Sequence, residues 1–275
     1  MMPTKIEWTD ETWNPIVGCS KVSPGCANCY AERFAARLRP GVPFTTITLH
    51  DERLAQPTHW KRPRRIFVGS MTDLFQVGIP TAFLDLIFLR MMIDSRHTFQ
   101  VLTKRPDLAA AYLWGVRDRP SYVGAGLNAA LLGDLDYPMV ETRPLANAFG
   151  RFWPLPNVWL GISAETQPWA DARIPVLLKT PAAVRFVSFE PLLGPIVGSA
   201  IHEGIDWYII GGESGPNARP MDLAWATGLV KAAAERGIPC FVKQLGGWPD
   251  KRDRLADFPP ELQVREFPDG KATIR

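Results

Sequence analysis

Three cysteines near the amino terminus give this sequence its strongest chemical signal. Cys19, Cys26 and Cys29 form a CX6CX2C pattern, and the first gap contains Pro24 and Gly25, which favour a turn. Thiolates bind iron and zinc, and three of them leave one metal coordination position open for another ligand. We therefore predict that the three cysteines bind a metal, and we favour an iron–sulfur cluster over zinc.

A structural zinc site is the alternative, and it would need a fourth protein ligand. No histidine or further cysteine lies close to the motif, so a distant residue would have to close the site. A third alternative is that the thiols are buried without any metal. The distant candidates for a fourth ligand are His50, His59, His97, His202 and Cys240.

Charged residues follow several apolar, β-rich runs at the point where each run ends. The carboxyl ends of parallel strands form the active sites of α/β barrels and open α/β sheets. For any one residue, a solvated strand end is an equally good interpretation, whereas the whole set indicates a site for a polar, charged ligand. The set consists of Asp73, Lys104, Glu165, Glu190, Glu213 and Lys243.

The order of the apolar runs predicts an α/β fold, a partial or full (β/α) barrel of parallel strands. Helices are expected at 81–94 and 222–236, where apolar residues recur at three-to-four spacing. The expected strands are 65–70, 99–103, 158–164, 185–190, 207–212 and 240–244, with a further short strand at 13–18.

One domain is expected, because 275 residues are too few for two confident α/β domains. We place a single barrel-like domain at 1–247, with an insertion at 115–156 that could act as a lid. Residues 248–275 are expected to form an irregular carboxyl-terminal tail with a terminal hairpin around Pro268, Asp269 and Gly270.

Composition excludes several classes of protein. A formal net charge of +3 is too small for an obligate nucleic-acid coat. No apolar run approaches the length of a membrane span, and the amino terminus lacks the features of a secretory signal. We therefore expect a cytoplasmic protein without membrane contact, in a compartment that keeps its thiols reduced.

The segment TWNPIVGCSKVSPGCANCYAERFA resembles the signature of the phage Gp37/Gp68-type three-cysteine-motif family (DUF5131). The resemblance continues through GSMTDLF, VLTKRP, NVWLGISAE, RFVSFEPLLGPI, WYIIGGESGPNARPM and VKQLG. This family in turn is similar to radical S-adenosylmethionine (SAM) enzymes of the group that includes spore photoproduct lyase and DNA-repair photolyase-like proteins. The resemblance implies a [4Fe-4S] cluster on Cys19, Cys26 and Cys29, with SAM on the fourth iron.

The same resemblance implies roles for other residues around the cofactors. Tyr30 is expected near adenine, in place of the aromatic residue that usually precedes the last cysteine, a position that Asn28 takes here. The first cysteine gap is also longer than the usual CX3CX2C. The implied SAM-binding residues are Ser70, Thr72, Asp73, Lys104, Ser163, Glu165 and Tyr30, and the candidates for catalysis are Glu190, Glu213, Lys243 and Cys240.

The resemblance implies an electron donor and a substrate that could be DNA or RNA. A separately encoded partner protein of the three-cysteine-motif system is equally admissible. The competing hypothesis is a zinc- or cluster-stabilised nucleic-acid-binding protein of phage or mobile-element origin, without SAM chemistry. Its phosphate contacts would come from Arg62, Arg64, Arg65, Lys104 and Arg105, and its stacking surfaces from Trp60 or Trp114.

Overall fold

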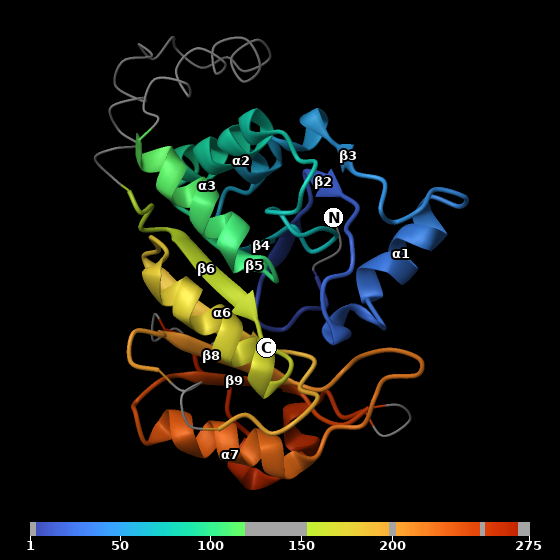
Figure 1. The fold of residues 1–275 in the computed structure, drawn as a ribbon, viewed down its shortest axis with the longest axis vertical. Coiled ribbons are helices and arrows are strands. Elements are labelled where there is room, and N and C mark those ends of the chain that lie inside the picture. Colours follow the sequence, from blue (N-terminus) through green and yellow to red (C-terminus); the bar gives the residue numbers. More distant parts are fainter. Residues whose placement is uncertain (1–3, 119–152, 198–201, 248–250, 269–275) are drawn as a thin grey trace.

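A curved sheet of seven parallel strands forms the centre of the protein. The computed structural model describes residues 4–118, 153–197, 202–247 and 251–268. Every pairing in this sheet is parallel, and the sheet curves into an open half-barrel (Figure 1), which confirms the predicted fold class. The strands, in their order across the sheet, are β1 (Glu11–Trp13), β4 (Arg65–Val68), β5 (Thr98–Thr103), β6 (Val158–Ser163), β7 (Val184–Phe189), β8 (Trp207–Gly211) and β9 (Cys240–Gln244).

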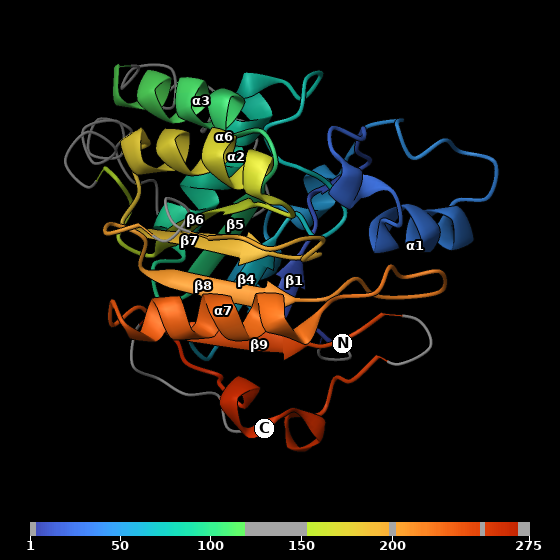
Figure 2. The ribbon, with the colours of Figure 1, turned by 60° about the horizontal axis from the view of Figure 1, so that its bottom comes forward.

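Helices cover one face of this sheet. They are α2 (Thr81–Ile93), α3 (Pro106–Asp118), α6 (Gln167–Lys179) and α7 (Leu223–Ala234). A fifth helix, α1 (Tyr30–Leu38), follows the cysteine motif and stands apart from the others in Figures 1 and 2. Short 3₁₀ turns occupy Pro24–Cys26, Asp51–Arg53, Gln56–His59, Leu255–Asp257 and Pro260–Leu262.

Alternation along the strands divides the core into two parts. Residues such as Ile66, Val187 and Val242 face the helices, and their neighbours Phe67 and Phe186 face the concave side. Because side chains on a strand alternate between faces, each strand contributes to both parts. The concave side is filled by an aromatic cluster that also takes side chains from both ends of the chain. Its members are Trp8, Phe67, Trp159, Phe186, Trp207, Ile209, Phe241 and Phe267.

The expected strand at 13–18 is wrong as a single element. β1 ends at Trp13, and β2 (Ile16–Val17) pairs antiparallel with β3 (Thr48–Leu49) outside the main sheet. Asn14 and Pro15 separate the two pieces, because proline has no N–H to donate and the Asn14 side chain instead bonds Ser70. The chain can therefore leave the sheet just before the cysteines.

Helix α3 continues into the expected insertion as far as Asp118. Trp153 and Leu155, at the far end of that insertion, pack against the main core. Residues 119–152, which include most of the expected lid, lie outside the described residues.

The carboxyl-terminal tail is not a loose appendage over its described part. Phe258 and Leu262 are buried in the main core, and Arg265 and Arg252 form isolated bridges with Phe241 and Leu245. The expected hairpin at 268–270 extends beyond the described residues. Within the described part of the chain, no helix combines the length and the apolar character needed to cross a membrane.

Candidate functional site

The three motif cysteines line one pocket at the carboxyl ends of strands β4, β5 and β6. The cavity volume of the pocket is about 150 Å³, and the pocket opens to solvent. All three thiols are free and partly exposed. Apart from Cys19, Cys26 and Cys29, its lining includes Tyr30, Phe44, Phe67, Ser70, Thr72, Asp73, Leu102, Lys104, Arg105 and Ser163.

Asp73 holds the first cysteine of the loop through Arg105. The buried Asp73 carboxylate accepts hydrogen bonds from Thr103 Oγ1 at 2.7 Å and from Arg105 Nη1 at 3.0 Å. Arg105 in turn donates to the Ser20 carbonyl and hydroxyl, both at 2.8 Å, and its Nη1 lies 3.9 Å from Cys19 Sγ. Burial and the Asp73 charge raise the pKa of Cys19, against the opposing effect of Arg105.

Glu165 holds the middle of the loop. One of its oxygens accepts the Gly25 N–H at 3.1 Å, and the other accepts Arg173 Nη1 at 2.9 Å. The Glu165 side chain is 0% exposed, and a side chain at Gly25 would meet its carboxyl carbon at 3.0 Å. Burial opposes ionisation, but a hydrogen bond from Ser23 and the charges of Lys104 and Arg173 outweigh it and lower the pKa of Glu165.

Glu213 holds the end of the loop. Its carboxylate accepts Asn28 Nδ2 at 2.8 Å and both the backbone N–H and the guanidinium of Arg219. Arg219 also donates to the Pro24 carbonyl at 3.0 Å. Burial raises the pKa of Glu213, and the hydrogen bonds from Arg219 and Asn28 overcome this effect and lower it.

We call these three carboxylate–arginine pairs the loop clamps: Asp73–Arg105, Glu165–Arg173 and Glu213–Arg219. Their carboxylates follow strands β4, β6 and β8. Each is a charge-assisted hydrogen-bonded pair, the strongest kind of side-chain hydrogen bond. Together they bind the backbone or side chains of the loop at Ser20, Pro24, Gly25 and Asn28. The long first cysteine gap therefore has specific partners that hold it over the sheet edge.

The remaining pair of predicted charges is not part of a clamp. Lys243 Nζ lies 2.5 Å from Glu190 Oε1, at the ends of β9 and β7, and both side chains are partly exposed. Cys240 lies elsewhere: it is buried on the helix-covered face of the sheet, where burial raises its thiol pKa to about 12. Its thiol therefore does not line the cysteine pocket.

Several of the implied SAM-binding side chains have protein partners. Thr72 donates to the Gly18 carbonyl at 2.6 Å, Ser70 exchanges hydrogen bonds with Asn14, and Tyr30 donates to the Ser70 carbonyl at 2.7 Å. Asp73 and Glu165 are occupied in the clamps. By contrast, Lys104 and Ser163 line the pocket, and among the described residues no hydrogen bond to Lys104 Nζ or Ser163 Oγ is present.

The donor set fits a cluster better than a closed zinc site. Cys19, Cys26 and Cys29 are soft ligands that share one open pocket, and no histidine lines that pocket. His97, one candidate fourth zinc ligand, is buried and bonds Pro57 and Arg64 instead. Among the described residues, no three His, Cys, Asp or Glu side chains already stand in the arrangement of a metal site.

The basic residues of the competing nucleic-acid hypothesis do not form one surface. Arg64 and Arg65 lie at the amino-terminal end of β4, whereas Lys104 and Arg105 follow the carboxyl-terminal end of β5. Arg64 is also paired with Glu11, and Trp60 is buried. These two groups of cations therefore lie at opposite ends of the parallel strands.

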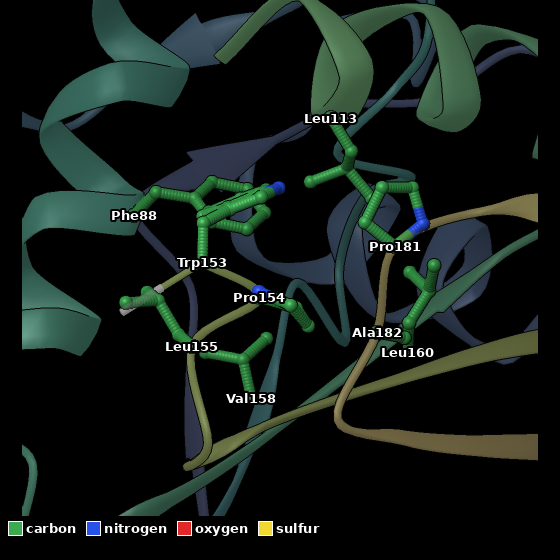
Figure 3. A pocket seen from close by; sticks show the side chains of 9 residues that line it. All are labelled: Phe88, Leu113, Trp153, Pro154, Leu155, Val158, Leu160, Pro181 and Ala182. Carbon is green, nitrogen blue, oxygen red and sulfur yellow. The ribbon is translucent and has the colours of Figure 1, made fainter. Parts of the chain in front are cut away.

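A second cavity lies on the helix-covered face, between α2, α3 and the start of β6 (Figure 3). Its lining has no titratable side chain, so it provides packing volume and no chemistry. The lining residues are Phe88, Leu113, Trp153, Pro154, Leu155, Val158, Leu160, Pro181 and Ala182.

Sequence reasoning missed the arginine partners of the clamps. The sequence analysis assigns Arg105 only to phosphate contact and Asn28 only to the position before the last cysteine, and it assigns no role to Arg173 or Arg219. The acidic partners can be recognised in the sequence because each follows an apolar strand. The arginines cannot, because their distance along the sequence from the acidic partner differs from one clamp to the next.

Comparison with known proteins identifies the family of the chain. The model of a family described as a protein of unknown function, DUF5131, matches residues 3–270. Searches of the curated proteins and of the solved structures found no match.

Proposed function

Because this chain belongs to the DUF5131 family, whose function is unknown, we propose a function from its own pocket: it is a radical SAM enzyme. In this proposal Cys19, Cys26 and Cys29 hold a [4Fe-4S] cluster. The observation that carries the proposal is that these three free thiols line one pocket at the carboxyl edge of a parallel half-barrel. Such an edge is where α/β barrels build their active sites.

The residues of the pocket would bind and orient SAM. Phe67 and Leu102 form an apolar wall that would exclude water, while Lys104 and Ser163 offer an ammonium and a hydroxyl for polar groups of the ligand. When bound and reduced, the cluster and SAM would supply a 5′-deoxyadenosyl radical that abstracts a hydrogen atom from the substrate.

The loop clamps would hold the backbone of the cysteine loop over the pocket before any metal binds, and the three thiols would close around the metal when it binds. Asp73, Glu165 and Glu213 would then act as positioning residues for the cysteine loop, and Asp73 and Glu165 would not serve as direct ligands of SAM. The Glu190–Lys243 pair remains available to hold or move a proton at Glu190 Oε1 or Lys243 Nζ. These two residues are our candidates for contact with the substrate.

The substrate class proposed is nucleic acid, on the basis of the lyase-like resemblance, and the reducing cytoplasm is the proposed location. A protein substrate, including a separately encoded partner, is the alternative outcome. The chain would also need an electron donor.

The test is anaerobic reconstitution with iron and sulfide, followed by reduction with dithionite in the presence of SAM. We expect slow formation of 5′-deoxyadenosine, which can be quantified by chromatography. Cys26→Ala should abolish it, because loss of one thiolate ligand destabilises the cluster. Cys240→Ala is the matched control and should keep both cluster and product, because Cys240 lies outside the pocket.

Two results would contradict the proposal. A fully clustered, reduced preparation that neither binds SAM nor yields 5′-deoxyadenosine would leave a cluster protein without SAM chemistry. A colourless preparation that retains zinc would favour the zinc-stabilised alternative.

A further inference from the structure

Helix α1 exposes an apolar stripe to solvent. Tyr30, Phe34 and Leu38 recur at four-residue spacing and are 44%, 51% and 67% exposed. The buried face of the same helix consists of Ala31 and Ala35. A surface helix normally buries its large apolar residues and exposes its small or polar ones. In α1 this order is reversed, so its outer face has the character of a surface that a partner covers.

Val22 in the cysteine loop and Val42 after α1 are also exposed. Figures 1 and 2 both show α1 at the margin of the molecule, away from the four helices that cover the sheet. We call the face formed by Tyr30, Phe34 and Leu38 the α1 stripe.

The chain around the α1 stripe is basic. Residues 21–42 contain one acidic residue, Glu32, so four basic minus one acidic residue gives a net charge of +3. The whole chain also has a formal net charge of +3, so the remaining residues together are neutral. A partner with an acidic surface would therefore be attracted to this face. The four basic residues are Lys21, Arg33, Arg37 and Arg39.

The composition of the stripe favours a protein over the other possible occupants. Leu38, its most exposed residue, is aliphatic, and the Tyr30 hydroxyl donates to the Ser70 carbonyl, so Phe34 is the one ring of the stripe left to stack. Surfaces that bind single-stranded nucleic acid instead stack successive bases on several aromatic rings. A second copy of the chain would bring two positively charged faces together, which is unfavourable. An acidic protein with apolar contact residues fits both the charge and the chemistry.

The position and size of the stripe indicate an electron carrier. Tyr30 follows Cys29 directly and lines the cysteine pocket, so a protein on the stripe would lie beside the metal-binding loop. Nine helical residues span only about 14 Å. Weak redox encounters use small interfaces of this kind, and opposite charges accelerate their association.

We propose that the α1 stripe is the docking site of a small acidic electron-carrier protein. This inference rests on the proposed function, because the carrier would be oxidised by one electron and the cluster on Cys19, Cys26 and Cys29 reduced by one. No bond forms or breaks in this step.

The experiment measures binding of an oxidised acidic flavodoxin to the metal-free chain by calorimetry. Phe34→Glu and Leu38→Glu each add a negative charge to the stripe without touching the cysteine pocket. Val77→Glu is the matched control, because Val77 is 82% exposed and lies outside the stripe. We expect each stripe variant to weaken binding by about tenfold or more and the control by less than about twofold. Binding of the unmodified chain should also weaken as salt rises.

The second readout is the rate of cluster reduction in the reconstituted protein. Reduced flavodoxin should act more slowly on the stripe variants, whereas dithionite should act equally on all variants. Failure of flavodoxin to bind, or equal binding by all variants, would overturn the docking site even if dithionite-driven SAM cleavage succeeds. Stripe-dependent binding without SAM cleavage would overturn the proposed function and leave the docking site intact.

Two further outcomes would assign the stripe to another occupant and overturn the proposal. One is a dimer of the unmodified chain that Leu38→Glu dissociates in sedimentation. The other is binding of a single-stranded oligonucleotide that the stripe variants weaken while flavodoxin binding stays unchanged.

Discussion

Replacement of Glu165 by glutamine should destabilise the protein more than the same change at Glu213. The Glu165 side chain is 0% exposed and its partner Arg173 is 3% exposed, so the substitution leaves a buried guanidinium without its counter-charge. Removal of one partner from a buried ion pair costs about 3–5 kcal/mol. The side chain keeps its size, so no cavity contributes to this cost.

Glu213→Gln is the matched comparison. Its partner Arg219 has a side chain that is 34% exposed, so water can solvate the guanidinium after the change. We expect a cost of about 1–3 kcal/mol. Both values can be measured by urea unfolding of the metal-free protein. A cost for Glu165→Gln below about 1 kcal/mol, or below that of Glu213→Gln, would refute the assignment of Glu165 as a buried clamp.

A double variant separates the stability of the fold from the position of the loop. Glu165→Leu with Arg173→Met removes both charges, which should recover much of the lost unfolding free energy. The Gly25 N–H would still lack its acceptor, so the loop should remain loosely held. We therefore expect lower iron content after reconstitution despite recovered stability. Full recovery of both properties would show that the clamp does not position the cysteines.

Three further predictions concern the clamps and the core. The pKa values of Glu165 and Glu213 are lowered from 4.5 in the folded protein, so the two carboxylates stabilise the fold fully above that pH. This stabilisation is lost as the pH falls through the lower folded pKa values. An acid titration followed by circular dichroism should show the loss, and unfolding of Glu165→Gln should depend less on pH. Gly161→Ala should cost about 1–3 kcal/mol in thermal unfolding, because the new Cβ would lie 2.3 Å from the Phe186 ring, whereas Gly228→Ala in α7 has open space and should be neutral or stabilising. Leu262→Ala should cost about 2–5 kcal/mol in urea unfolding if the tail belongs to the core, and an exposed, mobile tail would give almost no change.

The central strands could be predicted from the sequence because their residues are apolar on both faces. β8 and β9 were predicted within one residue of their bounds, since each is a short apolar run between turns. The expected strand at 65–70 ends earlier, at Val68, because Gly69 adopts a φ of +80° and turns the chain.

Helices α1, α3 and α6 are not among the helices that the sequence predicts, and for α1 and α6 the physical reasons differ. α6 contains Pro175 in its interior, where proline removes a backbone donor and usually ends a helix. In α1 the large apolar residues face solvent, so the usual relation between apolar periodicity and burial is inverted. Tertiary packing, rather than local pattern, accounts for these elements.

The sequence predicts the carboxylates of the loop clamps but not the arginines that pair with them. Asp73, Glu165 and Glu213 follow strands, and parallel strands end at the same edge, so topology alone brings them near the cysteine loop. Arg173, the seventh residue of α6, reaches back to Glu165, and Arg219 lies in an irregular loop. Such contacts depend on side-chain directions that no periodic pattern encodes.

The most direct test of the account is the metal content of the protein purified and reconstituted without oxygen. We predict about four iron atoms and four sulfides per chain, a brown colour, and a paramagnetic signal after one-electron reduction that changes when SAM is added. Cys19→Ala, Cys26→Ala and Cys29→Ala should each lose this signal. A colourless chain with about one zinc ion, and no iron after reconstitution, would contradict the account.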